Sequence, residues 1–284
     1  MGAAIAGRLA GLGHELTIWN RTPDKARALA AATGLKLAQT PAELAACSEF
    51  IITILTDAKA VEAVYGTMLS ADVKGKLFIE MSTVRPAVQK RLSLKVKEKQ
   101  GAFIECPVGG TIGPAKEGKL FGFAGGDAAD VARARPILDQ MCRRVEHVGP
   151  AGAGASMKLA INLPLLVYWQ ALGEALSLIK NLNLDAARVI NILADTSGAP
   201  NMMKNRAATV AAALAGKDGG AVTVNIDTLR KDLAEMVEEA HSLGWQAPAA
   251  EAALASFTRA SQAGLGAKDC VMLPVDWSSA PKKL

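Results

Sequence analysis

Two polar residues, Lys158 and Asn162, stand four positions apart near the start of a long apolar stretch. We expect this stretch to be helical over residues 156–179, and four residues make just over one helical turn, so both side chains project from one face. Burial among apolar side chains lowers the pKa of an ammonium group, which would let such a lysine donate or accept a proton near neutral pH. Composition alone equally allows a lysine whose ammonium extends to solvent from the first helical turn. The elements that position the pair must decide between these interpretations.

The first half of the chain alternates short apolar segments with segments of helical pattern, which predicts an α/β fold with a doubly wound parallel sheet. The expected strands are residues 15–19, 50–55, 76–81, 102–105, 120–124 and 145–148. The expected helices between them include residues 23–31, 86–99 and 128–141.

From Gly152 onward the strand patterns stop and helical patterns follow one another, at residues 156–179, 185–193, 201–214, 226–243 and 248–262. Gly149 and Pro150 form a turn signal between the last strand and the first long helix. The sequence therefore predicts two domains, a sheet-containing domain at residues 1–150 and an all-helical domain at residues 151–284. Residues 276–284 read as a loose tail.

Charge and cysteine usage narrow the class of protein. The chain has 284 residues, 50% of them hydrophobic, and its 32 basic and 27 acidic residues give a net charge of +5. The basic residues are scattered, which disfavours nucleic acid as a partner and suits a small anionic ligand. The four cysteines form no CxxC pair and no metal-binding pattern with the three histidines, so we expect a reduced, metal-free, cytoplasmic protein. No uninterrupted apolar stretch approaches the roughly twenty residues that span a bilayer, so we expect no membrane association.

The opening residues 1–14 are rich in Gly and Ala and predict a helix before the first expected strand. In a dinucleotide-binding βαβ unit, a strand and a GxGxxG turn precede such a helix and hold the pyrophosphate at its N-terminus. Gly2 could be the last glycine of that turn. In that case the first strand and the first two glycines are missing from the chain as given.

Asn20, Arg21 and Thr22 follow the expected strand 15–19, where a mononucleotide-binding fold meets the adenosine ribose. An acidic residue there would bind the ribose hydroxyls, whereas Arg and Thr suit a 2′-phosphate. This favours NADP(H) over NAD(H) as the cofactor. Thr22 before Pro23 also fits a helix cap, a role that is compatible with the first.

Further motifs follow in order along the chain. They are Leu55-Thr56, Ser82-Thr83-Val84-Arg85-Pro86, Pro107-Val108-Gly109-Gly110-Thr111, the GxGxxxKxxxN run of residues 152–162, and Lys231-Asp232-Leu233. With Met1-Gly2 they cover nearly the whole chain and resemble the β-hydroxyacid dehydrogenase family, which includes 3-hydroxyisobutyrate dehydrogenase, 6-phosphogluconate dehydrogenase and the glyoxylate/succinic semialdehyde reductases. The resemblance implies a Rossmann-type sheet domain followed by an all-helical domain.

The same resemblance implies roles for individual residues. Lys158 would be the catalytic general acid and base, and Asn162 would contact the substrate. The cofactor would be bound by Gly2, Asn20, Arg21, Thr22, Leu55, Thr56, Thr83 and Lys231. Independently of the resemblance, the chemistry of the residues suggests that a substrate carboxylate would be bound by the Ser82 hydroxyl, by Arg85 and by the backbone donors of Gly109, Gly110 and Thr111.

Five positions depart from the family pattern, and one of them is Arg85, which stands where many relatives have a small or polar residue. Gly109 replaces the serine of its PVSGG loop and Thr111 replaces the last glycine of that loop. Ile161 stands where relatives often have a second polar residue, and Pro164 cannot donate a helical hydrogen bond. We therefore expect a substrate pocket that differs from that of a standard 3-hydroxyisobutyrate enzyme.

Taken together, we expect an NADP(H)-dependent oxidoreductase acting on a small 3-hydroxy acid or the corresponding semialdehyde. One alternative is an imine reductase on the same fold, although relatives with that activity usually replace the lysine found at 158. Another is a non-catalytic binding protein, if the first strand is truly absent. Helical domains of this family commonly pair, and residues 163–179 are apolar, so we expect a homodimer or homotetramer.

Overall fold

The structure is a computed structural model and describes residues 1–217 and 220–279. The chain divides into two compact units, Met1–Leu159 and Ala160–Leu284. The division falls after Leu159, inside the helix that carries Lys158 and nine residues after Pro150. The first turns of this helix therefore belong to the compact unit that contains the sheet.

The first unit contains a six-stranded sheet in the order β3-β4-β5-β7-β6, with β8 paired to β7. Its strands are β3 (Phe50–Thr53), β4 (Leu77–Glu80), β5 (Ala102–Glu105), β6 (Val108–Gly109), β7 (Leu120–Gly126) and β8 (Cys142–Gly149). A separate two-stranded parallel sheet holds β1 (Thr17–Ile18) and β2 (Lys36–Leu37).

The main sheet is mixed, which corrects the expectation of a purely parallel sheet. Strands β3, β4 and β5 are parallel, but β7 runs antiparallel to both β5 and β6 and parallel to β8. The link from β6 to β7 contains just the six-residue helix α6 (Ile112–Glu117), which is too short for the crossover that a parallel neighbour requires. The α/β class of the prediction is confirmed.

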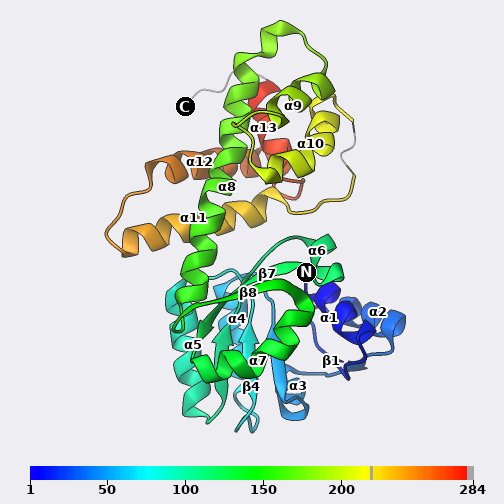
Figure 1. Cartoon of the computed structure of the whole chain (residues 1–284), viewed down its shortest axis with the longest axis vertical. Helices are drawn as coiled ribbons and strands as arrows, with labels where there is room; N and C mark the ends of the chain where they lie inside the picture. Colours follow the sequence, from blue (N-terminus) through cyan, green and yellow to red (C-terminus); the bar gives the residue numbers. More distant parts are fainter. Residues whose placement is uncertain (218–219, 280–284) are drawn as a thin grey trace. The chain divides into compact units, whose positions relative to one another are not determined.

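Helices cover both faces of this sheet (Figure 1). Strand residues alternate between the faces: Leu77 and Ile79 of β4 belong to one buried cluster, and Phe78 belongs to the other. The first cluster is completed by α1 (Gly2–Gly11), α6 and α7 (Ala128–Met141), and the second by α3 (Pro41–Cys47), α4 (Ala58–Met68) and α5 (Pro86–Glu98). The helix α2 (Pro23–Thr33) joins β1 to β2.

The second unit is helical in the residues that the structure describes. Its elements are the continuation of α8 (Ala153–Leu178), η1 (Lys180–Leu182), α9 (Ala186–Ala194), α10 (Asn201–Leu214), α11 (Ile226–Ser242), α12 (Pro248–Ala260), the π-helical turn η2 (Ser261–Leu265) and α13 (Met272–Ser279). The expectation of a loose tail from residue 276 is wrong as far as Ser279, because α13 buries Leu273, Pro274 and Ser278. The rest of that segment, residues 280–284, lies outside the described residues.

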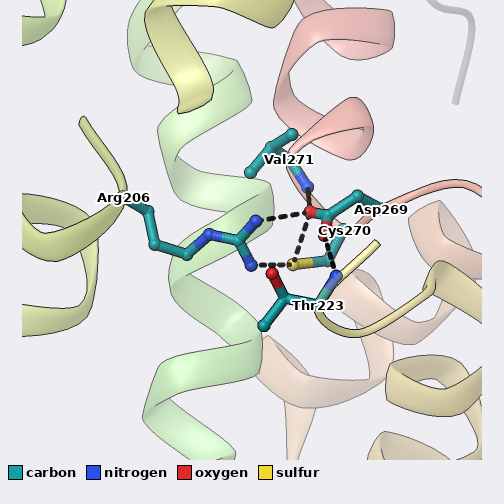
Figure 2. Close-up of polar contacts among 5 residues, drawn as sticks. All are labelled: Arg206, Thr223, Asp269, Cys270 and Val271. Carbon is teal, nitrogen blue, oxygen red and sulfur yellow. Dashed lines mark hydrogen bonds and ion pairs between the residues drawn. The ribbon is translucent and has the colours of Figure 1, made fainter. Parts of the chain in front are cut away.

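An ion pair between Arg206 and Asp269 fixes the loops of the helical unit (Figure 2). The Nη2 of Arg206 lies 2.8 Å from Oδ1 of Asp269, and the two side chains are 15% and 11% exposed. Asp269 also accepts backbone hydrogen bonds from Thr223 at 2.8 Å and Val271 at 3.1 Å. The guanidinium lies 5.9 Å from the ring centroid of buried Trp169. Trp169 is therefore a core residue of this unit.

Burial alone would raise the pKa of Asp269. The hydrogen bonds from Val271, Thr223 and Arg206, with the charge of Arg206, outweigh that effect and lower the pKa below its usual value. Asp269 therefore stays ionised in the folded protein.

The length and hydropathy of helix α8 bear on the expectation of no membrane association. Its 26 residues include an 18-residue window of mean hydropathy 1.2, so among the described residues one helix is long and apolar enough to cross a membrane. Polar residues, among them Lys158 and Asn162, interrupt the apolar run of this helix. Core helices of soluble proteins pass the same test.

Candidate active site

Three polar residues end neighbouring strands of the parallel half of the sheet. Thr53 of β3 is in register with Glu80 of β4, and Glu80 is in register with Glu105 of β5. All three side chains are buried, with both glutamates 0% exposed. The carboxyl ends of parallel strands are where ligands bind in open α/β sheets, so this row lies directly below the expected cofactor and substrate loops.

Glu80 links two loops, the one after β4 that contains Ser82 and the one after β3 that contains Leu55. One carboxylate oxygen accepts the backbone N–H of Ser82 at 3.0 Å and also the Ser82 hydroxyl, and the other oxygen accepts Gln89 Nε2 at 2.6 Å. The Ser82 hydroxyl in turn accepts the backbone N–H of Leu55 at 2.8 Å. Burial raises the pKa of Glu80, and the hydrogen bonds from Ser82, Gln89 and Thr53 oppose that rise.

The structure therefore brings Leu55 and Ser82 together, as two loops joined through one carboxylate. Ser82 is 1% exposed and its hydroxyl is engaged with protein atoms, so its expected contact with the substrate stays a prediction. Thr83 and Arg85 follow as half-buried residues, with Arg85 at the N-cap position of α5. Thr56 is exposed and donates its hydroxyl to Asp57, which caps α4.

Gly2 begins α1 next to the end of β3. A Cβ built at Gly2 would lie 3.0 Å from the Ile54 side chain, so the helix start lies close to the Leu55 loop. Arg21 and Thr22 are exposed after β1, and the Asn20 side chain donates to the Thr22 carbonyl at 2.9 Å. Thr22 occupies the N-cap position of α2, although in the described part of the chain its side chain makes no capping hydrogen bond. The expected cap position of Thr22 before Pro23 is therefore confirmed, without a hydrogen bond from its side chain.

The expected substrate loop includes one position that requires glycine. Gly110 has φ +127°, and a Cβ there would lie 2.8 Å from the Leu120 side chain. Gly109 belongs to β6, and Thr111 is exposed at the start of α6.

Cys106, just before this loop, is fully buried, and burial raises the pKa of its thiol far above the usual value. It is therefore a packed residue and no nucleophile.

Lys158 lies in the early turns of α8, and its side chain is 8% exposed. The helix runs unbroken through Asn162, half-buried one turn later, and through Pro164. The burial of Lys158 favours the first of the two sequence interpretations, and its role in proton transfer stays a prediction. Lys231 lies on α11 with its Nζ 2.6 Å from Oδ1 of Asp232, and its contact with the cofactor stays a prediction.

The start of α8 is joined to the end of β5. Oε1 of Glu105 accepts the backbone N–H groups of Gly152 at 2.6 Å and Gly154 at 3.0 Å. A Cβ at Gly154 would overlap the carbonyl oxygen of Phe123, so a glycine is required for this close approach. The two glycines that precede Lys158 in the sequence therefore let the helix start lie against the sheet.

Glu80 and Glu105 are the polar site residues that the sequence argument missed. Each ends a four-residue apolar strand, Leu77-Phe78-Ile79-Glu80 and Ala102-Phe103-Ile104-Glu105. The alternation of a strand places each glutamate on the same face as a buried phenylalanine, and that pattern would have identified both as buried carboxylates. Among the described residues, no group of three or more His, Cys, Asp or Glu side chains could hold a metal ion.

Two family models match the chain. Residues 1–149, more than half of it, match the NAD binding domain of 6-phosphogluconate dehydrogenase. Residues 152–273 match a domain described as NAD-binding of NADP-dependent 3-hydroxyisobutyrate dehydrogenase. The two matches follow one another without overlap, in the order of the two units.

Individual proteins give the same picture. The mitochondrial 3-hydroxyisobutyrate dehydrogenase of Drosophila melanogaster is 32% identical over 199 residues, which are 70% of this chain and 61% of that protein. Glyoxylate/succinic semialdehyde reductase 1 of Arabidopsis thaliana is 32% identical over 196 residues, 68% of each protein. The solved structure of Mycobacterium tuberculosis 3-hydroxyisobutyrate dehydrogenase with L-serine matches with a TM-score of 0.85 and 25% identity, covering 99% of this chain and 96% of that one. This chain thus spans less than two thirds of the fly protein and nearly all of the bacterial one.

Proposed function

Because the chain belongs to the β-hydroxyacid dehydrogenase family, we propose that it is an NADP(H)-dependent oxidoreductase acting on a small 3-hydroxy acid or the matching semialdehyde. The observation that best supports this proposal is the burial of Lys158 in a helix whose start is hydrogen-bonded to the carboxyl edge of the sheet. A buried ammonium is costly without a role, and a general acid and base beside the cofactor loops is such a role.

The residues at the carboxyl edge fit a nicotinamide dinucleotide. The helix α1 starts at Gly2 beside the end of β3, and backbone N–H groups at a helix start bind phosphate. Arg21 is exposed after β1, where its guanidinium can reach a 2′-phosphate. When bound, the cofactor would supply or accept the hydride.

Lys158 performs the proton transfer in this proposal. In reduction its ammonium donates a proton to the oxygen of the carbonyl group, and in oxidation the neutral amine takes the proton of the alcohol. Asn162, one turn further along α8, holds the substrate oxygen or orients the lysine. Arg85 and the backbone of the Gly109–Thr111 loop receive the substrate carboxylate.

The substrate class can be tested with a panel of small 3-hydroxy acids, semialdehydes and cyclic imines, each assayed with both cofactors. We expect turnover of at least one hydroxy acid or semialdehyde and a preference for NADP(H). Reduction of imines without turnover of any hydroxy acid or aldehyde would favour an imine reductase. NADPH binding without turnover of any compound would favour a binding protein.

Replacing Arg21 by alanine is expected to weaken NADPH binding about tenfold or more and to leave NADH binding nearly unchanged, because a charge-assisted hydrogen bond to the 2′-phosphate contributes roughly 1.5–3 kcal/mol. The dissociation constants of both cofactors, measured by fluorescence titration, check this. Arg27→Ala on α2 is the matched control, since the Arg27 side chain is 63% exposed and its guanidinium pairs with Asp24. An equal loss for both cofactors would refute the 2′-phosphate assignment.

We also propose a homodimer or homotetramer. The helical unit exposes large apolar side chains at its surface, among them Leu178, Leu182 and Ile192. Exposed apolar side chains of this size favour association.

A further inference from the structure

Glu105 is a fully buried carboxylate to which the proposed chemistry gives no role. It ends β5, and its Oε1 accepts the backbone N–H groups of Gly152 and Gly154 at the start of α8. Its Oε2 is buried with no hydrogen-bond partner in residues 1–217 and 220–279. One oxygen thus binds the helix start, and the carboxylate complements the positive end of the helix dipole.

Lys158 stands one helical turn after Gly154. Side chains of a helix lean toward its N-terminus, so the lysine extends over the turn that Glu105 binds. The close approach of Gly154 to Phe123 holds the same turn against the sheet. The backbone that bears Lys158 is therefore held by two elements of the first unit, β5 and β7.

We propose that Glu105 is a positioning residue for Lys158, because its carboxylate holds the first turn of α8 against the end of β5 and so fixes the point from which the lysine reaches the reacting oxygen. The inference rests on the proposed role of Lys158. Glu105 touches neither cofactor nor substrate in this proposal, so it acts only through the helix.

The charge state of Glu105 gives this role a measurable signature. Burial raises the pKa of Glu105 to about 7, while the N–H groups of Gly152, Ala155 and Gly154 oppose the rise and neighbouring Glu80 adds to it. Other ionisable groups on the elements around it are Cys106 next in the chain, Lys90 of α5 beside Gly152, and Lys158. Below pH 7 the protonated carboxyl is a weaker acceptor for the helix start, so Lys158 is held less well.

When a carbonyl group is reduced, Lys158 and Glu105 affect opposite sides of the pH dependence of kcat. Lys158 must be protonated, so its titration lowers kcat at high pH. Glu105 must be ionised, so its titration lowers kcat as the pH falls through about 7. The acid side of the profile therefore reports on Glu105.

Two variants of Glu105 test the proposal, and kcat for reduction is measured from pH 5.5 to 9 for each variant and for the controls. Glu105→Gln keeps the length and one acceptor oxygen but loses the charge; we expect kcat at pH 8 to fall about 10- to 100-fold, the loss that a displacement near 1 Å can cause. Its acid limb near pH 7 should disappear, and its KM for NADPH should stay within about twofold, because the cofactor loops are held by Glu80. Glu105→Asp keeps the charge but is one methylene shorter, so kcat falls while an acid limb remains.

Glu98→Gln, at an exposed position of α5, is the control for loss of a carboxylate and should match the unmodified protein. Thermal unfolding and NADPH binding establish that each variant is folded; if Glu105→Gln does not fold, Glu105→Asp decides the matter. A Glu105→Gln protein with unchanged kcat and an unchanged acid limb would overturn this inference while leaving the role of Lys158 intact. Normal turnover in Lys158→Ala, assayed in the same series, would instead overturn the proposed function.

Discussion

Replacing Lys158 by alanine is expected to lower kcat about a thousandfold in both directions, within the range that a general acid or base contributes. Alanine cannot donate a proton to the developing alkoxide or take one from the alcohol. NADPH binding should remain within about twofold, because the residues proposed to bind the cofactor belong to other elements. Steady-state kinetics and a fluorescence titration of NADPH measure the two quantities on the same preparation.

Two further variants sharpen this result. Lys158→Arg keeps a positive charge but cannot give up its proton at neutral pH, so oxidation of the alcohol should be lost as completely as with alanine. Lys95→Ala removes an exposed lysine from α5 and should leave kcat unchanged. Turnover near the normal rate in Lys158→Ala would show that another group performs the proton transfer.

The second large effect is expected in the helical unit. Asp269→Ala should lower the free energy of unfolding by about 3 kcal/mol or more, because removal of one partner leaves the other charge of a buried pair uncompensated. Here Arg206 would remain 15% exposed beside Trp169, and the N–H groups of Thr223 and Val271 would lose their acceptor. Urea unfolding followed by tryptophan fluorescence measures the loss.

The matched control is Asp139→Ala. Asp139 pairs with Arg135 at the same 2.8 Å distance, but its side chain is 52% exposed, so its loss should cost less than about 1 kcal/mol. Equal effects of the two variants would contradict the proposed importance of the Arg206–Asp269 pair.

The contribution of the Arg206–Asp269 pair to the free energy of unfolding is also expected to depend on pH. The pKa of Asp269 is lower in the folded protein than in the unfolded chain, where an aspartate titrates near about 3.9. Its contribution to stability is therefore complete above the unfolded pKa and is lost as the pH falls through the folded pKa. Asp269→Ala and the unmodified protein should differ in stability at pH 7 and converge under strongly acidic conditions.

Much of the fold could be predicted because the hydrophobic period is strong in the longer elements. The predicted bounds of β5, α7 and α10 match the structure. The missed elements are mostly short or weakly patterned. The strands β2 and β6 have two residues each, α3 has seven and α6 has six. Such segments form because neighbouring elements hold them, and a local pattern cannot reveal that.

The polar residues of the site were predictable in part. Lys158 was found because a cation in an apolar helix is unusual. The partner of Glu105 lies 47 positions further along the chain, at Gly152, so no local spacing joins them. The direction of β7 escaped prediction for a similar reason, since its pairing with β5 depends on the return of the chain through α6.

The helix α8 has two parts that belong to different compact units, one fixed to the sheet and the other part of the helical unit. This division matters for protein engineering. Residues up to Leu159 belong to the first compact unit, where Glu105 and the close approach of Gly154 determine the backbone position of Lys158. From Ala160 onward the same helix belongs to the second unit, and its surface includes Ile161, which is 44% exposed. A library of substitutions at Ile161 therefore changes the surface of the second unit while the attachment of Lys158, the proposed general acid and base, stays intact.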